Sequence, residues 1–295
     1  MALYPSLQGR RILITGGGRG FGREMALAFA RQGALLLLTA ARNGDELGQT
    51  VADANAIAPG CCIGELADVA LEADCTRIAS VARSRLGGID ILFNNAARSP
   101  AEAMTRFDRA APTPFWEADA AGYERLIVTN IVGPFLMAQR LAPAMVQQGF
   151  GRIINMLTSG PTMTVSGRGP YGASKAALEA STAIWARDLA GSGVTVNGLL
   201  PGGASDTALI PGDNIGQRAV PGFRAGKNSG GGSEGTLAGL LPADIIVPPA
   251  LWLAADESAA WTGRRFVAKD WDDALGWESA AAQSVTEMVD VPRIL

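Results

Sequence analysis

The chain has 295 residues, of which 48% are hydrophobic and 18% charged, and its formal net charge is -3. This composition is typical of a globular protein with a sizeable core, and it shows no basic surplus that would favour nucleic acid as a partner. The chain contains no histidine, which excludes Ser-His-Asp and Cys-His triads and all histidine-dependent metal sites. Cys61, Cys62 and Cys75 lack the spacing of four metal ligands, so we expect reduced thiols, no metal and a cytoplasmic location.

Targeting and membrane segments are not expected. The first ten residues carry no apolar stretch of signal-peptide length. The longest apolar run, at 34–38, is far shorter than the ~20 residues that a membrane helix needs. We therefore expect a protein that is neither exported nor inserted in a membrane.

Short β-rich runs alternate with longer helical patterns, which predicts βαβ units and a parallel sheet covered on both faces. In the segment between the first two strands, Phe21, Met25 and Phe29 recur every four residues and Gly33 follows, which is typical of an amphipathic helix and its end. The fold class is therefore α/β, a doubly wound sheet in a single domain spanning residues 1–295. Seven strands are expected, at 11–15, 35–39, 63–66, 89–93, 152–156, 195–200 and 265–268.

Two long segments interrupt this alternation, at 98–121 and 203–241. Connections longer than about 15 residues are usually functional lids or disordered stretches. We interpret 203–241, which is rich in glycine, as a substrate loop or lid, and a plain disordered insertion is the alternative.

A glycine-rich turn connects the first strand to the first helix. The stretch from Thr15 to Gly22 directly follows an apolar strand and opens an amphipathic helix, the context in which such a turn cradles the pyrophosphate of a nucleotide. Gly16 permits the tight turn, Gly20 lets backbone amides approach phosphate, and Gly22 allows the helix to pack closely on the sheet. The turn therefore predicts a dinucleotide site.

A tyrosine and a lysine stand four residues apart in Tyr171-Gly172-Ala173-Ser174-Lys175. In a helix both side chains project from one face. An ammonium held there favours phenolate, so we expect Lys175 to lower the pKa of Tyr171 from about 10 toward working pH. The pair indicates a proton donor beside the dinucleotide, and the alternative is that both residues lie on a solvated helix.

In order and spacing, these motifs resemble those of the short-chain dehydrogenase/reductase family. The resemblance runs from about residue 8 to residue 270 and implies a Rossmann-type domain with a seven-stranded parallel sheet. It is carried by the turn at 15–22, Asp68-Val69, Asn94-Asn95-Ala96-Ala97, Asn130, the Tyr171 to Lys175 stretch, and Pro201-Gly202.

The resemblance also implies the site residues. The catalytic set is Asn130, Thr158, Tyr171 and Lys175. The cofactor-binding set is Gly16, Gly18, Arg19, Gly20, Phe21, Arg42, Asp68, Val69, Asn95, Ala96, Ala97, Tyr171, Lys175, Pro201, Gly202 and Thr207.

Two positions depart from the family pattern. Counting back from Tyr171 places the family's catalytic serine at Thr158, whose hydroxyl has the same hydrogen-bonding capacity, while Ser159 is the alternative if the local spacing shifts. Thr207 lies one residue later than the family spacing, which leaves its contact with the nicotinamide carboxamide open.

The implied reaction is the interconversion of a secondary alcohol and a ketone by hydride transfer to or from a nicotinamide cofactor. Tyr171 would serve as general acid or base, Thr158 would orient the carbonyl, and Lys175 would bind the nicotinamide ribose. Asn130 would hold a water that links Lys175 to solvent.

The end of the second strand bears on the choice of coenzyme. It reads Thr39-Ala40-Ala41-Arg42-Asn43, without the acidic residue that grips a ribose 2′-hydroxyl, and Arg19 lies within the glycine turn. Both observations favour NADP, with NAD as the alternative. The other interpretation of Arg42 is an exposed residue at the start of a helix.

The expected partners are a small alcohol or ketone and further copies of the chain. The substrate is expected to be largely apolar, because apolar residues lie at positions where the family lines its substrate cleft. Each of these residues could equally belong to the core: Phe107, Phe115, Trp116, Met163, Leu209, Ile210 and Phe223. Small residues on the helix expected at 171–190 fit either a homodimer or homotetramer interface, which the resemblance implies, or internal packing. The C-terminal extension at 270–295 continues past the usual end of the family.

Other classes of function stay open. A catalytically weak NADP-binding sensor or scaffold is supported by Thr158 in place of serine and by the altered C-terminal motif. The presence of Tyr171, Lys175 and Asn130 argues against it, since a pure binding module does not need all three. A sugar-nucleotide epimerase or dehydratase normally has a different glycine spacing.

Overall fold

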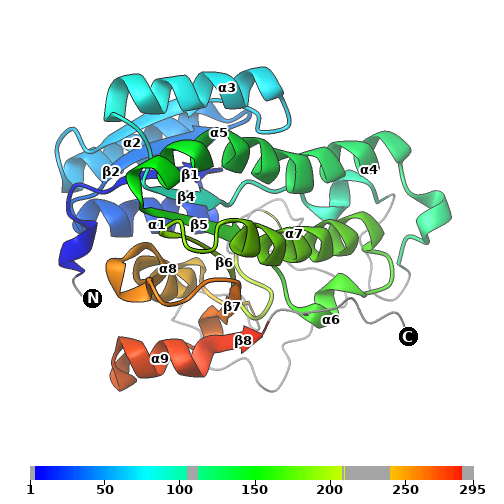
Figure 1. Ribbon diagram of the computed structural model, residues 1–295. Coiled ribbons are helices and arrows are strands. Elements are labelled where there is room, and N and C mark those ends of the chain that lie inside the picture. Colours follow the sequence, from blue (N-terminus) through cyan, green and yellow to red (C-terminus); the bar gives the residue numbers. More distant parts are fainter. Residues whose placement is uncertain (1–3, 105–111, 208, 210–239, 288–295) are drawn as a thin grey trace.

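The computed structural model describes residues 4–104, 112–207, 209 and 240–287. Its centre is one eight-stranded sheet with the order β3-β2-β1-β4-β5-β6-β7-β8 (Figure 1). The strands are β1 Arg11–Thr15, β2 Leu35–Ala40, β3 Cys62–Leu66, β4 Ile91–Asn94, β5 Gly151–Met156, β6 Val194–Leu200, β7 Arg264–Val267 and β8 Val285–Glu287.

The first seven strands are parallel, which confirms the seven predicted strands with small shifts at their ends. The eighth strand was not expected, because a three-residue strand is too short to show an alternating pattern. It pairs antiparallel with β7, in the register Phe266 with Val285. The sheet is therefore parallel with one antiparallel edge strand that comes from the C-terminal extension.

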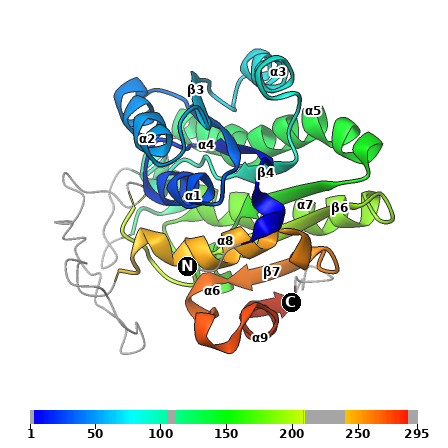
Figure 2. The same cartoon turned by 90° about the vertical axis from the view of Figure 1, so that its left-hand side faces the viewer.

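Helices cover both faces of the sheet (Figures 1 and 2). Buried side chains of α1, α2 and α8 form one core with the sheet, and those of α3, α5 and α7 form a second core on the other face. The central strands are buried on both sides, as in other parallel sheets. The helices are α1 Gly20–Arg31, α2 Gly44–Ile57, α3 Glu72–Val81, α4 Ala120–Ile127, α5 Gly133–Gln148, α6 Gly160–Met163, α7 Gly169–Asp188, α8 Val247–Ala254 and α9 Trp277–Ser284.

Local sequence signals explain where these helices begin and end. The side chain of Asn43 accepts a hydrogen bond from the Glu46 amide and caps α2, and Asp119 caps α4 in the same way through Gly122. Gly33, with φ of +74°, ends the turn after α1 in a conformation that favours glycine. Helix α7, which carries Tyr171 and Lys175, begins at residue 169, two residues before the predicted start at 171.

The strand order creates a crevice at the carboxyl edge of the sheet. The chain moves outward from β1 to β2 and β3, and then returns to the other side of β1 as β4. In open α/β sheets ligands bind where the strand order reverses in this way. Thr15 ends β1 and Asn94 ends β4, so the predicted motifs after these two strands meet at that point.

Two predicted regions are described only in part. Most of the expected lid at 203–241 lies outside the described residues, which include only 203–207, 209, 240 and 241 of it. The C-terminal extension is described as far as residue 287, where α9 buries Ala280 and Ala281 and leads into β8. Within the described part of the chain, no helix is both long and apolar enough to span a bilayer.

Candidate active site

Two adjoining cavities lie at the carboxyl edge of the sheet. The first has a volume of about 350 Å³ and is lined by the glycine turn, the end of β2 and the residues that follow β3 and β4. The second, of about 220 Å³, is lined by residues after β5, the start of α7 and the segment after β6. The two cavities share Phe21, Asn95, Ala97, Thr207 and Leu209.

The glycine turn has positions that only glycine fits. A Cβ atom on Gly22 would lie 2.2 Å from the Gly16 carbonyl oxygen, and one on Gly18 would lie 3.0 Å from the Leu47 amide nitrogen. Gly16 and Gly20 have φ of +68° and +51°, in the left-handed region. The turn thus brings backbone, without side chains, to the wall of the first cavity.

Hydrogen bonds hold this turn against the segment that follows β4. The Thr15 hydroxyl accepts from the amides of Asn95 and Ala96, each at 3.0 Å, and donates to the Phe93 carbonyl at 3.2 Å. The Asn95 side chain donates to the carbonyls of Thr15 at 2.9 Å and Gly16 at 3.0 Å. The predicted motifs at 15–22 and 94–97 therefore form one connected structure.

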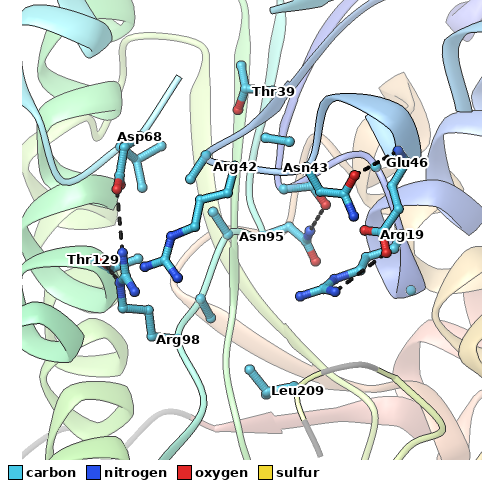
Figure 3. A pocket seen from close by; sticks show the side chains of 18 of the residues that line it. Arg19, Thr39, Arg42, Asn43, Glu46, Asp68, Asn95, Arg98, Thr129 and Leu209 are labelled. Carbon is cyan, nitrogen blue, oxygen red and sulfur yellow. Dashed lines mark hydrogen bonds and ion pairs between the residues drawn. The ribbon is translucent and has the colours of Figure 1, made fainter. Parts of the chain in front are cut away.

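Three arginines line the first cavity (Figure 3). Arg19 pairs with Glu46 at 3.6 Å, and Arg42 extends into the hollow between Asp68 and Asn43. Among the described residues, no ion pair of Arg42 is found.

Arg98, the third arginine, was not predicted. It donates from Nε to the Thr129 hydroxyl at 2.8 Å and pairs with Asp68 at 3.5 Å and Glu102 at 3.3 Å. Its position directly after the Asn94–Ala97 motif could have drawn attention to it, but the sequence gives no sign of these three contacts.

The lining of the first cavity has groups suited to the diphosphate of a dinucleotide. The N-terminus of α1 and the bare glycine backbone can bind a diphosphate, and Arg19 and Arg42 can offset its charge. The Thr39 hydroxyl is buried without a hydrogen-bond partner among the described residues, and it also lines this cavity. A buried hydroxyl without a partner is costly, and a polar group of a bound ligand would satisfy it.

The second cavity contains the predicted tyrosine and lysine on the first turns of α7. Tyr171 and Lys175 are almost fully buried, and the Lys175 ammonium donates to the Met156 carbonyl at 2.6 Å. The Lys175 Nζ atom lies 5.9 Å from the centre of the Tyr171 ring. The structure therefore brings both predicted side chains together at the carboxyl end of β5.

Burial dominates the pKa values of this pair. Desolvation raises the pKa of Tyr171 to about 12, against the lowering effects of a hydrogen bond with Thr158 and of the positive charge of Arg168. Burial also lowers the pKa of Lys175 to about 8. The expectation of a lowered tyrosine pKa caused by Lys175 is thus wrong for the protein without its ligands, because desolvation outweighs the nearby charges.

The two candidate hydroxyls after β5 have different partners. The Thr158 side chain hydrogen-bonds to Tyr171, whereas the Ser159 hydroxyl lies 2.8 Å from the Thr162 hydroxyl at the start of α6. Both residues line the second cavity. Of these two hydroxyls, that of Thr158 is the one that lowers the pKa of Tyr171.

Asn130 lies in a π-helical turn, Val128–Val132, between α4 and α5. Its side chain accepts from the Arg98 amide at 2.8 Å, and donates to the Ser174 hydroxyl at 3.1 Å and the Arg98 carbonyl at 3.4 Å. Such turns are frequent at functional sites. Asn130 is not among the residues that line either cavity, and it connects the loop after β4 to α7.

The remaining residues of the predicted cofactor set each line at least one of the two cavities. Phe21, Asp68, Val69, Ala96 and Ala97 line the first cavity, together with Thr207. Pro201 and Gly202 line the second cavity.

Of the four described residues that were expected in an apolar substrate cleft, three are not found there. Phe115 and Trp116 are 81% and 73% exposed, and Met163 is absent from the described lining, whereas Leu209 lines both cavities. Phe107, Ile210 and Phe223 lie outside the described residues. The described lining of the second cavity is mixed, with several hydroxyl groups and the charged residue Arg168, for which the sequence motifs give no sign.

Comparison with known proteins agrees with this geometry. The model of the short chain dehydrogenase family matches residues 10–214. A probable galactose dehydrogenase from Rhizobium meliloti is 31% identical over 267 residues, which are 90% of this chain and 95% of the relative. A sorbitol dehydrogenase from Cereibacter sphaeroides is 36% identical over 197 residues, 66% of this chain and 71% of the relative.

Solved structures show the same fold. A putative short-chain alcohol dehydrogenase from Sinorhizobium meliloti 1021 has a TM-score of 0.71 and 27% identity, and the match covers 90% of this chain and 97% of that one. Levodione reductase has a TM-score of 0.74 at 24% identity, with 88% and 95% of the two chains covered. The chain therefore belongs to the short-chain dehydrogenase family, oxidoreductases that act on CH–OH groups with a nicotinamide cofactor.

Proposed function

We propose that the protein interconverts a secondary alcohol and a ketone, with Tyr171 as the general acid and base. The observation that carries this proposal is the contact between two cavities. One holds Tyr171, Thr158 and Lys175, and it shares walls with the other, which holds the glycine turn. A proton donor and a dinucleotide would therefore meet at one point.

The chain's own residues have distinct tasks in this mechanism. The bound cofactor supplies or accepts the hydride at the carbonyl carbon. In reduction the Tyr171 phenol donates its proton to the carbonyl oxygen, so that one hydride and one proton together convert C=O to CH–OH, and in oxidation the phenolate removes that proton. The Thr158 hydroxyl orients the oxygen, and Lys175 binds the nicotinamide ribose of the cofactor. Asn130 holds α7 against the loop after β4 through Ser174.

Replacing Tyr171 tests the mechanism. In Tyr171→Phe we expect turnover to fall by about 10³-fold or more, because the proton donor is lost, while the Kd for NADPH stays within about threefold. Kinetics with a panel of ketones and a fluorescence titration of NADPH measure the two effects. Tyr123→Phe, a change at an exposed tyrosine of α4, is the matched control and should keep full activity.

The outcomes separate the candidate functions. An active Tyr171→Phe enzyme would contradict the role of the phenol. Tight binding of NADPH by the wild type without turnover of any ketone would contradict the enzyme proposal and favour the sensor or scaffold.

The preferred coenzyme is proposed to be NADP, because Arg42 and Arg19 line the first cavity and no acidic residue follows β2 before Asp45. In Arg42→Ala we expect KM for NADPH to rise about tenfold or more and KM for NADH to change little, since only NADPH carries the 2′-phosphate. Initial rates with both coenzymes measure this, with exposed Arg31→Ala as the control. A wild-type preference for NADH would overturn the proposal.

Assembly into a homodimer or homotetramer is also proposed. Ala173, Ala176, Ala180 and Ile184 form an exposed stripe along α7, with Ile184 52% exposed. A stripe of small residues on a helix surface permits close approach of a second copy, which supports assembly over internal packing at these four positions. Light scattering on the purified protein tests the assembly, and a monomer at micromolar concentration would contradict it.

A further inference from the structure

Arg168 lies beside the proposed reaction centre but outside the cofactor cavity. It is the residue that precedes α7, three positions before Tyr171, and its carbonyl accepts the Gly172 amide at 2.9 Å. It lines the second cavity and is not among the residues that line the first. Its charge acts on the part of the site that would hold substrate.

The two cavities differ in their charge balance. In the first, three arginines are accompanied by Asp68, Glu46 and Glu102. Of the described residues that line the second, Arg168 and Lys175 are charged and none is acidic. Lys175 is almost fully buried, whereas Arg168 is half-buried. Arg168 is therefore the more accessible positive charge in the described lining.

Neutral hydrogen-bonding groups line the same cavity as Arg168. Ser159 and Thr162 form a hydroxyl pair at 2.8 Å, and Ser205 adds a third hydroxyl to the cavity lining. Thr158 supplies the hydroxyl next to Tyr171. A cavity with these groups suits an oxygen-rich, negatively charged molecule better than the largely apolar one that the sequence suggested.

We propose that Arg168 binds a carboxylate of the substrate, so that the protein acts on hydroxy acids and the corresponding keto acids. A guanidinium binds a carboxylate through two parallel N–H···O hydrogen bonds, stronger than those between neutral groups. It binds a phosphate ester by the same chemistry, so the test includes both anions. This inference rests on the proposed alcohol and ketone chemistry and adds the substrate class to it.

An indirect role of Arg168 predicts a different result. If the arginine acted only by favouring phenolate at Tyr171, its loss would change the rates of charged and uncharged ketones by the same factor. If it binds the carboxylate, its loss slows the charged substrates alone. The comparison of an acid with its own ester therefore separates the two roles.

The experiment measures kcat/KM for matched ketones with NADPH and with NADH. The keto acids 2-oxobutanoate, 3-oxobutanoate, 4-oxopentanoate and 5-oxohexanoate are each compared with their methyl esters, and dihydroxyacetone phosphate with dihydroxyacetone. The variants are Arg168→Leu, Arg168→Gln and Arg168→Lys. The control is Arg83→Leu, which removes one exposed charge from a residue that lines neither cavity. If Arg168→Leu does not fold, Arg168→Gln gives the same comparison.

In the wild type we expect at least one acid to exceed its ester by about tenfold or more. Arg168→Leu and Arg168→Gln should lose this preference, mainly through KM, and change the ester rates by less than about threefold. Arg168→Lys should recover part of it, and Arg83→Leu should behave as the wild type. A wild-type preference for dihydroxyacetone phosphate over all the keto acids would mean that Arg168 binds a phosphate ester and not a carboxylate. That result would overturn the proposal.

Two further outcomes count against the inference. Turnover of esters as fast as acids, or an equal loss on both in Arg168→Leu, overturns it while the proposed function stands. If no ketone is turned over, the proposed function fails, and binding decides the role of Arg168. In that case 4-oxopentanoate must raise the melting temperature of the NADPH-loaded wild type by more than its methyl ester does. In Arg168→Leu this difference between the acid and the ester must disappear. Equal shifts overturn the inference.

Discussion

Opposing effects act on the phenol of Tyr171. Burial raises its pKa to about 12, while the hydrogen bond with Thr158 and the charge of Arg168 lower it. A high pKa keeps the phenol protonated at neutral pH, which suits a proton donor in reduction. Oxidation needs the phenolate, so it depends on the groups that lower the pKa.

Removing the Thr158 hydroxyl therefore has a predictable sign. In Thr158→Val the pKa of Tyr171 rises, and below that pKa the phenolate fraction falls tenfold per unit of rise. We expect alcohol oxidation to fall by about tenfold or more at a fixed pH and its rate profile to move to higher pH. A pH series of kcat/KM measures this, and Thr158→Ser, which keeps the hydroxyl, should retain the wild-type profile. An unshifted profile in Thr158→Val would remove Thr158 from the mechanism.

The turn between β1 and α1 is the element that positions the first cavity. The backbone of its glycines lies close to the backbone of neighbouring segments. Hydrogen bonds of Thr15 and Asn95 hold the turn to the segment that follows β4. Helix α1 packs on the sheet only because Gly22 has no Cβ, since an added Cβ would lie 2.2 Å from the Gly16 carbonyl oxygen. The packing of α1 and the shape of the first cavity thus depend on the same turn.

Two glycine substitutions should act in opposite directions. Gly22→Ala must move the turn, so we expect a lower melting temperature and a rise of about tenfold or more in KM for the coenzyme. In α2, a Cβ on Gly48 would meet no atom within 4 Å, so Gly48→Ala should stabilise the protein by about 0.5–1 kcal/mol and leave KM unchanged. Thermal unfolding and initial rates measure both. A normal KM in Gly22→Ala would argue against the turn as the diphosphate site.

At the scale of the molecule, an ion pair between Arg265 and Glu179 connects the proposed catalytic helix to the C-terminal edge of the sheet. Arg265 of β7 donates to both carboxylate oxygens of Glu179 in α7 at 3.1 Å, and from Nε to the Thr286 hydroxyl of β8 at 2.9 Å. The Glu179 side chain is 7% exposed and that of Arg265 is 18% exposed. Figure 1 shows β8 and α9 together beside β7, so the extension adds to the sheet rather than forming a separate unit.

Breaking this pair should cost more than removing it. Arg265→Met leaves the Glu179 carboxylate buried without its cation, and we expect a loss of about 3 kcal/mol in the free energy of unfolding. The double variant Arg265→Met/Glu179→Leu should recover most of that loss, because neither charge remains buried. Urea unfolding of the two variants and the wild type measures this. A double variant as unstable as Arg265→Met would show that the loss comes from packing.

The sequence alone determined the features that depend on local pattern. These features are the seven parallel strands, the glycine turn and the order of motifs from Thr15 to Gly202. They are readable because hydrophobic periodicity and the backbone conformations that require glycine both depend on residues that are neighbours in the chain. The family also follows from these motifs. The eighth strand could not be predicted, because three residues are too few for a periodic signal and its partner is distant in the chain.

Only the tertiary structure decided how the site is charged and buried. Desolvation depends on every element packed around a group, so the raised pKa of Tyr171 opposes the expectation drawn from Lys175 alone. The contacts of Arg98 with Thr129 and Asp68 join segments that are about 30 residues apart in the chain. The position of Arg168 in the second cavity likewise depends on how the chain folds. Phe115 and Trp116 looked like cleft residues and are exposed. Hydrophobic pattern fixes which segments are strands and helices, but the environment of a side chain is set by the packing of all of them together.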